Sequence, residues 1–583
     1  MAIASHSQSR RRPRSPKGAW LGVGAAVLLA ATACAPASGA PKANATAGST
    51  VPRSGGTVVD ALTPLTGMDW YLPLMPDAYN LTVNATAQSL QYLGLYVMGN
   101  NGVPDYARSV ASDITSNNAG TVYTVRMNPK WHWSNGLPVT ASDVEFEWHM
   151  IQAASAPTVP APWPWAGAGP TGLATLVKTF TVVNTHEFRV TTVRAVNQSW
   201  FVGQLGGFMP FPKASWDKYP GNHAKELAYL TANGSNPQFF SVTDGPFRLV
   251  KAVPEQSWTF LPNPHYDGHK PYLHRLVFQY ETTDTAELSG LQTGSIQVGY
   301  LPPTSYAIRD TLTLDRFVAL PQPATGGVTL DFKNPQVGAL LKQLPVRQAM
   351  EMGIDQPVIL RAIYNGLGVE GVGPVPSMSP YLDPQLKKPV YPFNIPGGIH
   401  LLEANGWHLV NGVMTNTAGQ KLQFSVHYMA GNSSFLALAQ ILSQDWAREG
   451  IKTSLRAVPF ATMHRDRLHP SLWEVGVGGL ATGGAMTYTI RNANFETNGP
   501  LNPEGYSNPT LDRLMATALG PLSRAAALRA DDAYQVFVAH HLPVLWLPVG
   551  DSYLEIAKTV HGVLSSRIKG SYAIYPQYWW VGQ

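Results

Sequence analysis

The sequence predicts a mixed α/β fold divided into more than one domain, and three observations indicate this. The chain has 583 residues, more than one hydrophobic core normally holds, which indicates two to four domains. Its 53 glycines, 48 prolines and low charged content of 13% favour many short strands and long loops over a coiled coil or bulk disorder. Within residues 121–150, a strand pattern, a turn and a helix start follow one another closely.

Residues 121–150, TVYTVRMNPKWHWSNGLPVTASDVEFEWHM, are the most informative stretch of the chain. Apolar and polar residues alternate over 123–127, the period of a strand with one buried face. The turn that follows contains Gly136, which is free to take a positive φ. Thr140 and Asp143 stand three apart before an apolar run, the capping-box pattern that opens a helix. The stretch predicts a strand, a turn and a capped helix, and by itself it names no function.

The formal charge of +5 first suggests a nucleic-acid or membrane partner, but its location argues against a nucleic acid. Residues 1–33 contain five basic residues and no acidic residue. These are Arg10, Arg11, Arg12, Arg14 and Lys17. Without them, 36 of the 41 basic residues remain against 36 acidic ones, so the rest of the chain is neutral. We therefore expect no nucleic-acid partner.

Residues 1–33 have the pattern of an export signal. Their basic start precedes an uncharged run, 18–33, which is shorter than the roughly 20 apolar residues of a membrane span. Cys34, the only cysteine, follows small residues and resembles the lipidated cysteine of bacterial lipoproteins, so we expect a membrane anchor there. The alternative is an ordinary signal peptide cut near 35–37, with Cys34 removed. Residues 34–54, rich in Ala, Ser, Pro and Gly, are expected to form a flexible tether.

Residues 121–150 resemble the signature of the extracytoplasmic solute-binding proteins of peptide and nickel ABC transporters, usually written YTFxLRxGxKFxDGxPxTAxDVxFSW. The matching positions include Tyr123, Thr124, Gly136, Pro138, Thr140, Ala141, Asp143, Val144, Phe146 and Trp148. Further segments resemble the same family in the same order, from residue 55 to the C-terminus. They include GGTVVDAL at 55–62, DGPF at 244–247, NPHYDG and KPYL within 263–273, VRQA at 346–349 and GYSNP at 505–509.

The resemblance implies a two-lobed, periplasmic-binding-protein-like fold of the large three-domain type, with a hinge and a ligand cleft between the lobes. After the signal and tether, the expected domains are discontinuous. Domain I comprises 55–95, 205–320 and 535–583, domain II comprises 96–204, and domain III, the opposing lobe, comprises 321–534. The tryptophans and the helix cap of 121–150 are then expected to form the fold and not to touch the ligand.

The implied function is the extracytoplasmic substrate-binding component of an ABC importer. Such a protein captures a small solute, a peptide or peptide-like molecule, by hinge closure and delivers it to permease subunits that work with a cytoplasmic ATPase. A lipid-anchored monomer at the outer side of the cytoplasmic membrane is expected. The alternatives are a non-peptide solute (a sugar, metal chelate or carboxylate), a ligand-binding subunit of a membrane sensor and, more remotely, a hydrolase.

Ligand contacts are expected in loops. Peptide-binding members of the family carry an acidic residue that pairs with the peptide amino group, but the corresponding stretch here, 475–495, has no acidic residue and one base, Arg491. An ammonium buried there without a carboxylate would be costly, so Arg491 favours a carboxylate or neutral polar ligand unless it is a solvated loop charge. Other candidates, each of which is alternatively a packing residue, are Trp70, Tyr71, Trp473 and Tyr488.

Motifs for catalysis have no support beyond chance. The glycines of 366–371 spell G-x-G-x-x-G, but they follow a predicted helix, whereas a dinucleotide-binding loop follows a strand. No H-E-x-x-H, G-x-S-x-G or P-loop pattern occurs. We therefore expect no catalytic residue, no metal site and no cofactor.

Overall fold

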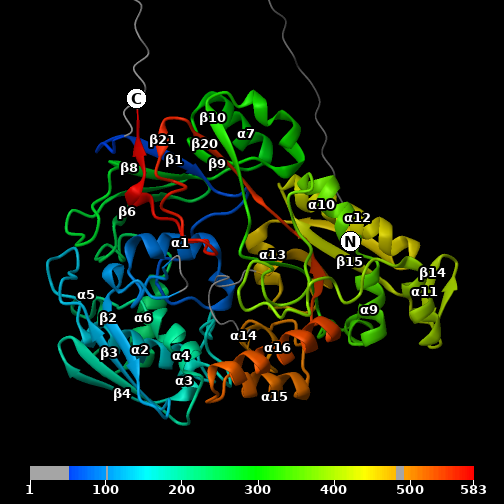
Figure 1. Ribbon diagram of the computed structural model, residues 1–583, viewed down its shortest axis with the longest axis horizontal. Coiled ribbons are helices and arrows are strands. Elements are labelled where there is room, and N and C mark those ends of the chain that lie inside the picture. Colours follow the sequence, from blue (N-terminus) through cyan, green and yellow to red (C-terminus); the bar gives the residue numbers. More distant parts are fainter. Residues whose placement is uncertain (1–50, 100–102, 481–491, 583) are drawn as a thin grey trace, which may run out of the picture. The chain divides into compact units, whose positions relative to one another are not determined.

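The computed structural model describes residues 51–99, 103–480 and 492–582. It is a mixed α/β fold with two lobes, each organised around its own β-sheets (Figure 1). We call the part that carries a seven-stranded and a four-stranded sheet the large lobe. The part that carries a five-stranded sheet is the small lobe.

The seven-stranded sheet of the large lobe contains strands from both ends of the chain. Its central strand β1 (Thr57–Ala61) pairs in parallel with β8 and β9, whereas the remaining pairings are antiparallel. The strand order is β10 (Asp315–Leu320), β20 (Ser552–Ala557), β9 (Val298–Tyr300), β1, β8 (Arg275–Gln279), β7 (Ser257–Pro262) and β6 (Phe247–Val253). The short pair β21 (Val560–His561) and β22 (Trp580–Val581) follows it in the chain.

The four-stranded sheet of the large lobe is antiparallel and is covered by helix α2 (Ala141–Ala154). Its order is β2 (Ala111–Ser116), β3 (Val122–Met127), β5 (Glu187–Thr192) and β4 (Val177–Asn184). The other helices of the large lobe are α1 (Thr82–Gln91), α3 (Leu173–Leu176), α4 (Gln198–Gly206), α5 (Lys213–Trp216), α6 (His223–Ala232) and α7 (Asp284–Thr293).

The five-stranded sheet of the small lobe mixes parallel and antiparallel pairs. Its order is β16 (Lys452–Val458), β15 (Gln423–Met429), β17 (Val475–Leu480), β11 (Thr325–Leu330) and β18 (Leu545–Leu547). Two short pairs are β12 (Gly368–Val369) with β19 (Val549–Gly550), and β13 (Trp407–Val410) with β14 (Val413–Asn416). The helices are α8 (Gly338–Leu341), α9 (Leu344–Met352), α10 (Gln356–Tyr364), α11 (Ile395–Ala404), α12 (Ser433–Arg448), α13 (Phe460–Asp466), α14 (Asn492–Phe495), α15 (Pro509–Ala518) and α16 (Arg524–His541).

Two chain crossings join the lobes. The first runs from β10 through 321–324 into β11, and the second runs from β18 through 548–551 into β20. The side-chain amide of Gln322 in the first crossing donates a 2.9 Å hydrogen bond to the backbone oxygen of Gly550 in the second. Residues 535–547, expected in domain I, contain the end of α16 and β18, and β18 pairs with β11 in the small-lobe sheet.

The unit predicted at 121–150 is present, with β3 followed by α2 and with Gly136 at a φ of 86°. The capping box of Thr140 and Asp143 is confirmed: the Asp143 carboxylate accepts 2.8 and 2.9 Å hydrogen bonds from the backbone N and the hydroxyl of Thr140. It also accepts bonds from the Trp133 indole, at 3.3 Å, and from the backbone N of Lys213, at 3.0 Å. One buried carboxylate therefore fixes a turn, a helix start and the distant segment around Lys213.

The tryptophans of this stretch form the core of the large lobe. Trp131 and Trp133 are almost fully buried, and Trp131 stacks on Tyr266 with ring centres 5.8 Å apart. The proline-rich loop 157–170 also packs inward, because the Trp163 indole is buried and donates to the Thr231 hydroxyl at 2.9 Å. These contacts confirm that the tryptophans of 121–150 help to form the fold, and they show that Trp163 also packs into it.

The glycines of 366–371 end a helix, as predicted. Helix α10 begins at a cap in which the Asp355 side chain accepts from the backbone N of Val358. It ends at Asn365, which has a left-handed φ of 53°, and Gly366 and Gly368 continue with positive φ into β12. No Rossmann-type strand precedes these glycines, so the dinucleotide-binding interpretation has no structural support.

Candidate functional site

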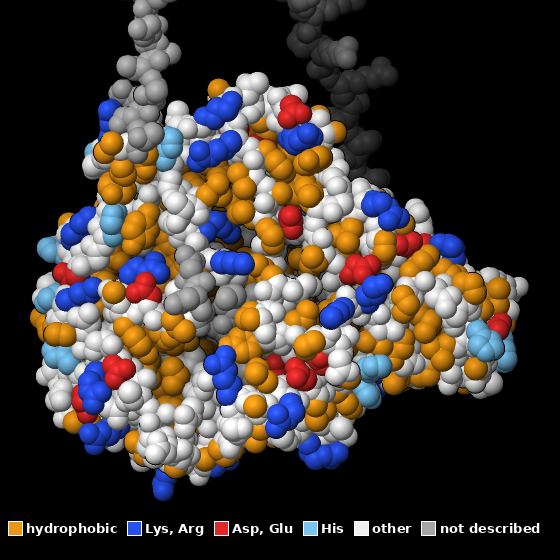
Figure 2. Space-filling model, viewed as in Figure 1, with side chains coloured by type: hydrophobic (Ala, Val, Ile, Leu, Met, Phe, Trp, Pro, Cys, Tyr) orange, Lys and Arg blue, Asp and Glu red, His pale blue; other side chains and the backbone are white. Residues whose placement is uncertain are grey.

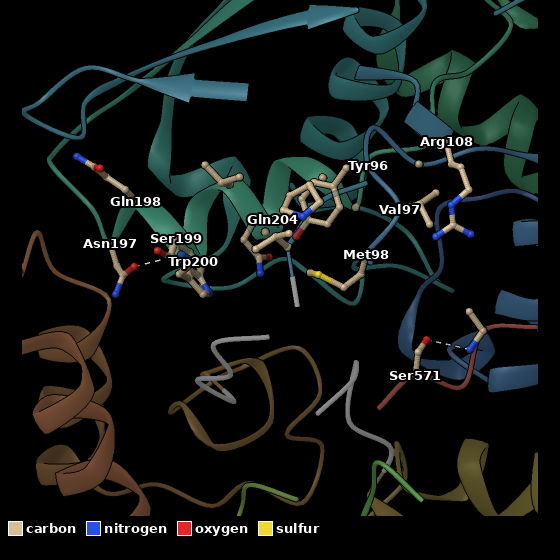
Figure 3. A pocket seen from close by; sticks show the side chains of 18 of the residues that line it. Tyr96, Val97, Met98, Arg108, Asn197, Gln198, Ser199, Trp200, Gln204 and Ser571 are labelled. Atoms are coloured by element: carbon tan, nitrogen blue, oxygen red, sulfur yellow. Dashed lines mark hydrogen bonds between the residues drawn. The ribbon is translucent and has the colours of Figure 1, made fainter. Parts of the chain in front are cut away.

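A cavity of about 1550 Å³ is lined by residues of both lobes. The large lobe contributes the end of α1, residues 92–98 and 103–108, helix α4 and residues 571–577, while the small lobe contributes 380–381 and 521–528 at the start of α16. Figure 3 shows several of these side chains directed into the open space below α4. Sites for drug-sized ligands usually measure about 300–1,000 Å³, so this cavity has room for a larger solute.

Helix α4 forms one wall of the cavity and is fixed at its start by Asn197. The Asn197 side-chain oxygen caps the helix by accepting from the backbone N of Trp200 at 3.1 Å. The same side chain donates to the backbone oxygen of Ala518 at 3.2 Å, and its backbone N donates to that of Leu519 at 2.8 Å. Since Ala518 and Leu519 lie at the end of α15, the wall is tied directly to the small lobe.

A second part of the wall is the segment that carries Tyr96, which lies against the end of α4. The backbone N of Tyr96 donates to Gly206 at 3.2 Å, and the Tyr96 ring covers Gly206 so closely that a Cβ there would lie 1.9 Å from a ring carbon. Burial raises the pKa of Tyr96 to about 12, so its hydroxyl stays protonated at neutral pH. In Figure 3 the side chains of Tyr96, Met98 and Gln204 gather at the cavity.

The charged side chains on the described part of this lining are Arg108 and Arg524. The Arg108 Nε donates to the Asp105 carboxylate at 2.7 Å, and its guanidinium carbon lies 5.4 Å from the centre of the Tyr575 ring. Burial lowers the pKa of Arg108, but the hydrogen bond and charge of Asp105 outweigh it and leave the pKa raised. Arg524, in the first turn of α16, is exposed.

The sequence-predicted aromatic contacts lie elsewhere. Trp70 is buried, stacks on Tyr79 with ring centres 4.4 Å apart and donates to the backbone oxygen of Leu74. Tyr71 is buried and accepts a 3.0 Å hydrogen bond from the Trp258 indole.

Trp473 is buried in the small lobe, and neither it nor the pair at 70–71 lines the cavity. Their expected ligand role stays a prediction. Tyr488 and Arg491, the two other ligand candidates, fall outside the described residues, and so does the lipidation candidate Cys34.

The residues that do line the cavity carry little signal in the sequence. Trp200 and Gln204 stand four apart on α4, which places them on one helix face, but this spacing is equally typical of a core-facing helix. Arg108 lies in a short turn and is noticeable only as a basic residue next to buried strands. The tertiary arrangement, by bringing α4 opposite the start of α16, makes these residues a site.

The described part of the chain supports neither a metal site nor a membrane-spanning helix. It contains no group of three or more His, Cys, Asp or Glu side chains placed to hold a metal ion. None of its helices is long and apolar enough to cross a membrane. On the face shown in Figure 2, basic and acidic side chains are interspersed, which agrees with the neutral charge balance found after residue 33.

The comparison with known families decides the classification. Residues 103–498 match the model of the bacterial extracellular solute-binding proteins, family 5. The chain belongs to this family. Its members are extracytoplasmic solute-binding proteins, and the family is one of binding proteins rather than enzymes.

Individual relatives of this family 5 protein are distant. Protein XP55 of Streptomyces lividans is 23% identical over 316 residues, which cover 52% of this chain and 57% of that protein. The chain thus spans little more than half the length of the curated relatives it matches.

Among solved structures, the oligopeptide-binding protein AppA from Bacillus subtilis, in complex with a nonapeptide, has a TM-score of 0.78 at 17% identity. That match covers 91% of this chain and 100% of AppA. NikZ from Campylobacter jejuni, in complex with Ni(L-His), has a TM-score of 0.74 at 17% identity, covering 90% and 99%. At this identity the two matches show that the fold is shared.

Proposed function

We propose that this family 5 protein is the substrate-binding component of an ABC importer. It captures a small solute, a peptide or peptide-like molecule, between its lobes and delivers it to a membrane permease driven by a cytoplasmic ATPase. The observation that carries the proposal is the large cavity lined by both lobes of a fold whose lobes are joined by two crossings. AppA is in complex with a nonapeptide and NikZ with Ni(L-His), and these two ligands support a solute in this size range.

The two crossings would act as the hinge about which the lobes close. Rotation about 321–324 and 548–551 changes few contacts within either lobe, because each lobe has its own sheets. A solute that touches α4 and the start of α16 together contacts both lobes only when they are closed. It therefore binds the closed state more strongly and shifts the population toward it.

The cavity requires no covalent chemistry of the protein, and we expect no catalytic turnover. The remote alternative is a hydrolase. Incubating the purified protein with mixed peptide, ester and glycoside pools, and following them by mass spectrometry, tests this directly. Product that accumulates beyond one equivalent per protein, and that disappears in a variant altered at the cavity, would establish the hydrolase in place of the binding function.

The ligand class has alternatives of its own, namely a sugar, a metal chelate or a carboxylate. Native mass spectrometry of protein purified from its own host would identify a co-purified solute and distinguish them. The 16 tryptophans provide a second measurement, since Trp200 lies at the cavity and its fluorescence is expected to change on closure. If no solute co-purifies and no peptide, sugar or chelate pool changes the fluorescence of folded protein, the binding function is wrong.

A role as the ligand-reporting subunit of a membrane sensor would use the same cavity. Deleting the gene separates the two roles, because loss of solute uptake indicates transport, whereas intact uptake with a lost transcriptional response indicates sensing.

We further propose that the mature protein is a monomer anchored through a lipid on Cys34. Mass spectrometry of the mature N-terminus would show a lipid-modified cysteine. A Cys34→Ala variant is expected to leave the membrane fraction, whereas a fully unmodified N-terminus beyond residue 34 would indicate an ordinary signal peptide.

A further inference from the structure

The charge of the cavity lining has one sign. Within the described part of the chain, its charged members are Arg108 from the large lobe and Arg524 from the small lobe. The residues outside that part, 1–50, 100–102, 481–491 and 583, include no Asp or Glu. Whatever their placement, none of them supplies a carboxylate side chain to the cavity.

Arg108 is held in a way that leaves part of its guanidinium available. Its Nε is occupied by Asp105 at 2.7 Å, and the Tyr575 ring lies 5.4 Å from its central carbon. Within the described structure its two terminal nitrogens, Nη1 and Nη2, make no hydrogen bond. Figure 3 shows this side chain at the cavity, in the neighbourhood of Val97. A guanidinium oriented in this way presents two parallel N–H groups, the geometry that a carboxylate accepts.

Uncharged polar groups complete the lining. The Tyr96 hydroxyl, the Ser199 hydroxyl and the Gln204 carboxamide line the cavity and make no side-chain hydrogen bond to other described residues. Together they supply donors and acceptors suited to the amide groups of a peptide-like solute. The rings of Trp200 and Tyr575 supply apolar faces between them.

We propose that the cavity takes solutes that carry a carboxylate or a comparable anionic group and no free ammonium, such as N-acylated peptides. This inference rests on the proposed function, since it assumes that the interlobe cavity is the ligand site. An ammonium that enters the cavity gives up part of its water and finds no carboxylate on the described lining, whose charged members are Arg524 and the Asp105-paired Arg108, which is unfavourable. An anion that reaches Arg108 and Arg524 together would be bound from both lobes, which favours closure.

The test compares four forms of one mixed-sequence pool of tetra- to hexapeptides: unmodified, N-acetylated, C-amidated, and modified at both ends. Binding to the purified full-length protein is followed by calorimetry and by tryptophan fluorescence. We expect the N-acetylated free acids to bind at least tenfold more tightly than the unmodified and the doubly modified forms. Equal or tighter binding of the unmodified peptides would overturn the inference and leave the proposed function intact.

Variants assign the preference to the two arginines. Arg108→Gln and Arg524→Gln are each expected to reduce the acid-over-amide preference at least threefold, and Arg108→Lys to restore part of it. Arg529→Gln is the matched control, because Arg529 is an exposed residue of the same helix that does not line the cavity. Melting temperatures confirm that each variant is folded. An unchanged preference in both glutamine variants would overturn the assignment.

If none of the four pools binds, the chemistry of the solute that co-purifies from the host decides whether the inference holds. A solute with an anionic group and no amine supports the inference, whereas a solute with a free ammonium overturns it while preserving the binding function. Absence of any solute, together with no response to sugar or chelate pools, overturns the proposed function and the inference with it.

Discussion

The His464 imidazole of the small lobe donates a 2.6 Å hydrogen bond from Nε2 to the backbone oxygen of Asp77 in the large lobe. Because a carbonyl oxygen only accepts, Nε2 carries the proton, and Nδ1 is left to accept from Arg467 at 3.5 Å. Arg467 in turn binds the Glu504 carboxylate at 2.6 Å. This hydrogen-bonded network links the two lobes through residues that are far from the crossings in the sequence. We therefore expect it to stabilise the closed state.

Removing this link should favour the open state. One hydrogen bond contributes about 0.5–1.5 kcal/mol, so His464→Ala is expected to weaken ligand binding by about 2- to 10-fold through the closure equilibrium. Ligand titration by fluorescence measures the affinity, and small-angle scattering measures the separation of the lobes. The control is His469→Ala, since His469 is exposed three residues beyond α13. Equal affinity in the His464 variant and the wild type would show that the link does not contribute to closure.

The wall of the cavity depends on a glycine. At Gly206 a Cβ would lie 1.9 Å from the Tyr96 ring, so Gly206→Ala must displace that ring and is expected to cost about 1–3 kcal/mol of stability. Ligand affinity should fall as well, because Tyr96 lines the cavity. Urea denaturation gives the stability change. The neighbouring Gly207→Ala is the control for stability, since the nearest atom to its Cβ would be 3.5 Å away and its φ is −76°. Similar losses in both variants would contradict this account.

The Asp143 carboxylate holds the most informative sequence segment together. It accepts four hydrogen bonds, from two groups of Thr140, from Trp133 and from Lys213. Asp143→Ala leaves buried donors unpaired and is expected to destabilise the protein by about 3 kcal/mol or more. Asp143→Asn, which keeps one accepting oxygen, should cost less. Thermal unfolding measures both, and a loss below 1 kcal/mol in the alanine variant would contradict the role assigned to this residue.

A buried acid on α16 predicts a pH dependence. Burial raises the pKa of Asp531 from 3.8 to about 8, with the nearby acidic residues Asp532 and Asp383 adding to the rise and the bond from Gln535 opposing it. The folded state therefore binds a proton that the unfolded state has released above pH 4. The stabilisation is fully present below pH 4 and is lost as pH rises toward 8.

The melting temperature should accordingly fall between pH 5 and 8, and Asp531→Asn should reduce this slope, because asparagine resembles the protonated acid and still accepts from Gln535. Melting curves at several pH values measure the slope. Asp310→Asn, at an exposed position, serves as the control. If the asparagine variant keeps the full wild-type slope, other groups are responsible for it.

Local features of the fold were predictable because local physics determines them. Alternation over 123–127 predicted a strand, the Thr140 and Asp143 pair predicted the helix start, and Gly136 predicted a turn with positive φ; the structure contains all three. Each of these features depends on residues within a few positions of one another. Segments resembling one family along the whole chain then predicted the two-lobed fold, which the structure shares with AppA and NikZ.

The site could be predicted only in part, because residues from distant segments form it. The sequence left Trp70 and Tyr71 open as ligand contacts or packing residues, and the structure buries both side chains away from the cavity lining. Tyr96, Gln204 and Arg108 looked ordinary, yet they line the cavity opposite the start of α16. Whether a loop side chain is buried or exposed depends on the segments that pack against it. In a chain with two crossings, those segments can lie hundreds of residues away in the sequence.

By itself, the sequence determined the family, the local elements and the absence of acidic residues from 475–495, since these need only residue identity and short spacing. The tertiary structure decided which side chains meet across the lobes, among them Asp77 with His464 and Asn197 with the end of α15. It also placed an arginine from each lobe on one cavity. The physical reason is that charge and hydrogen bonding act through space, over a few ångströms, whatever the separation along the chain.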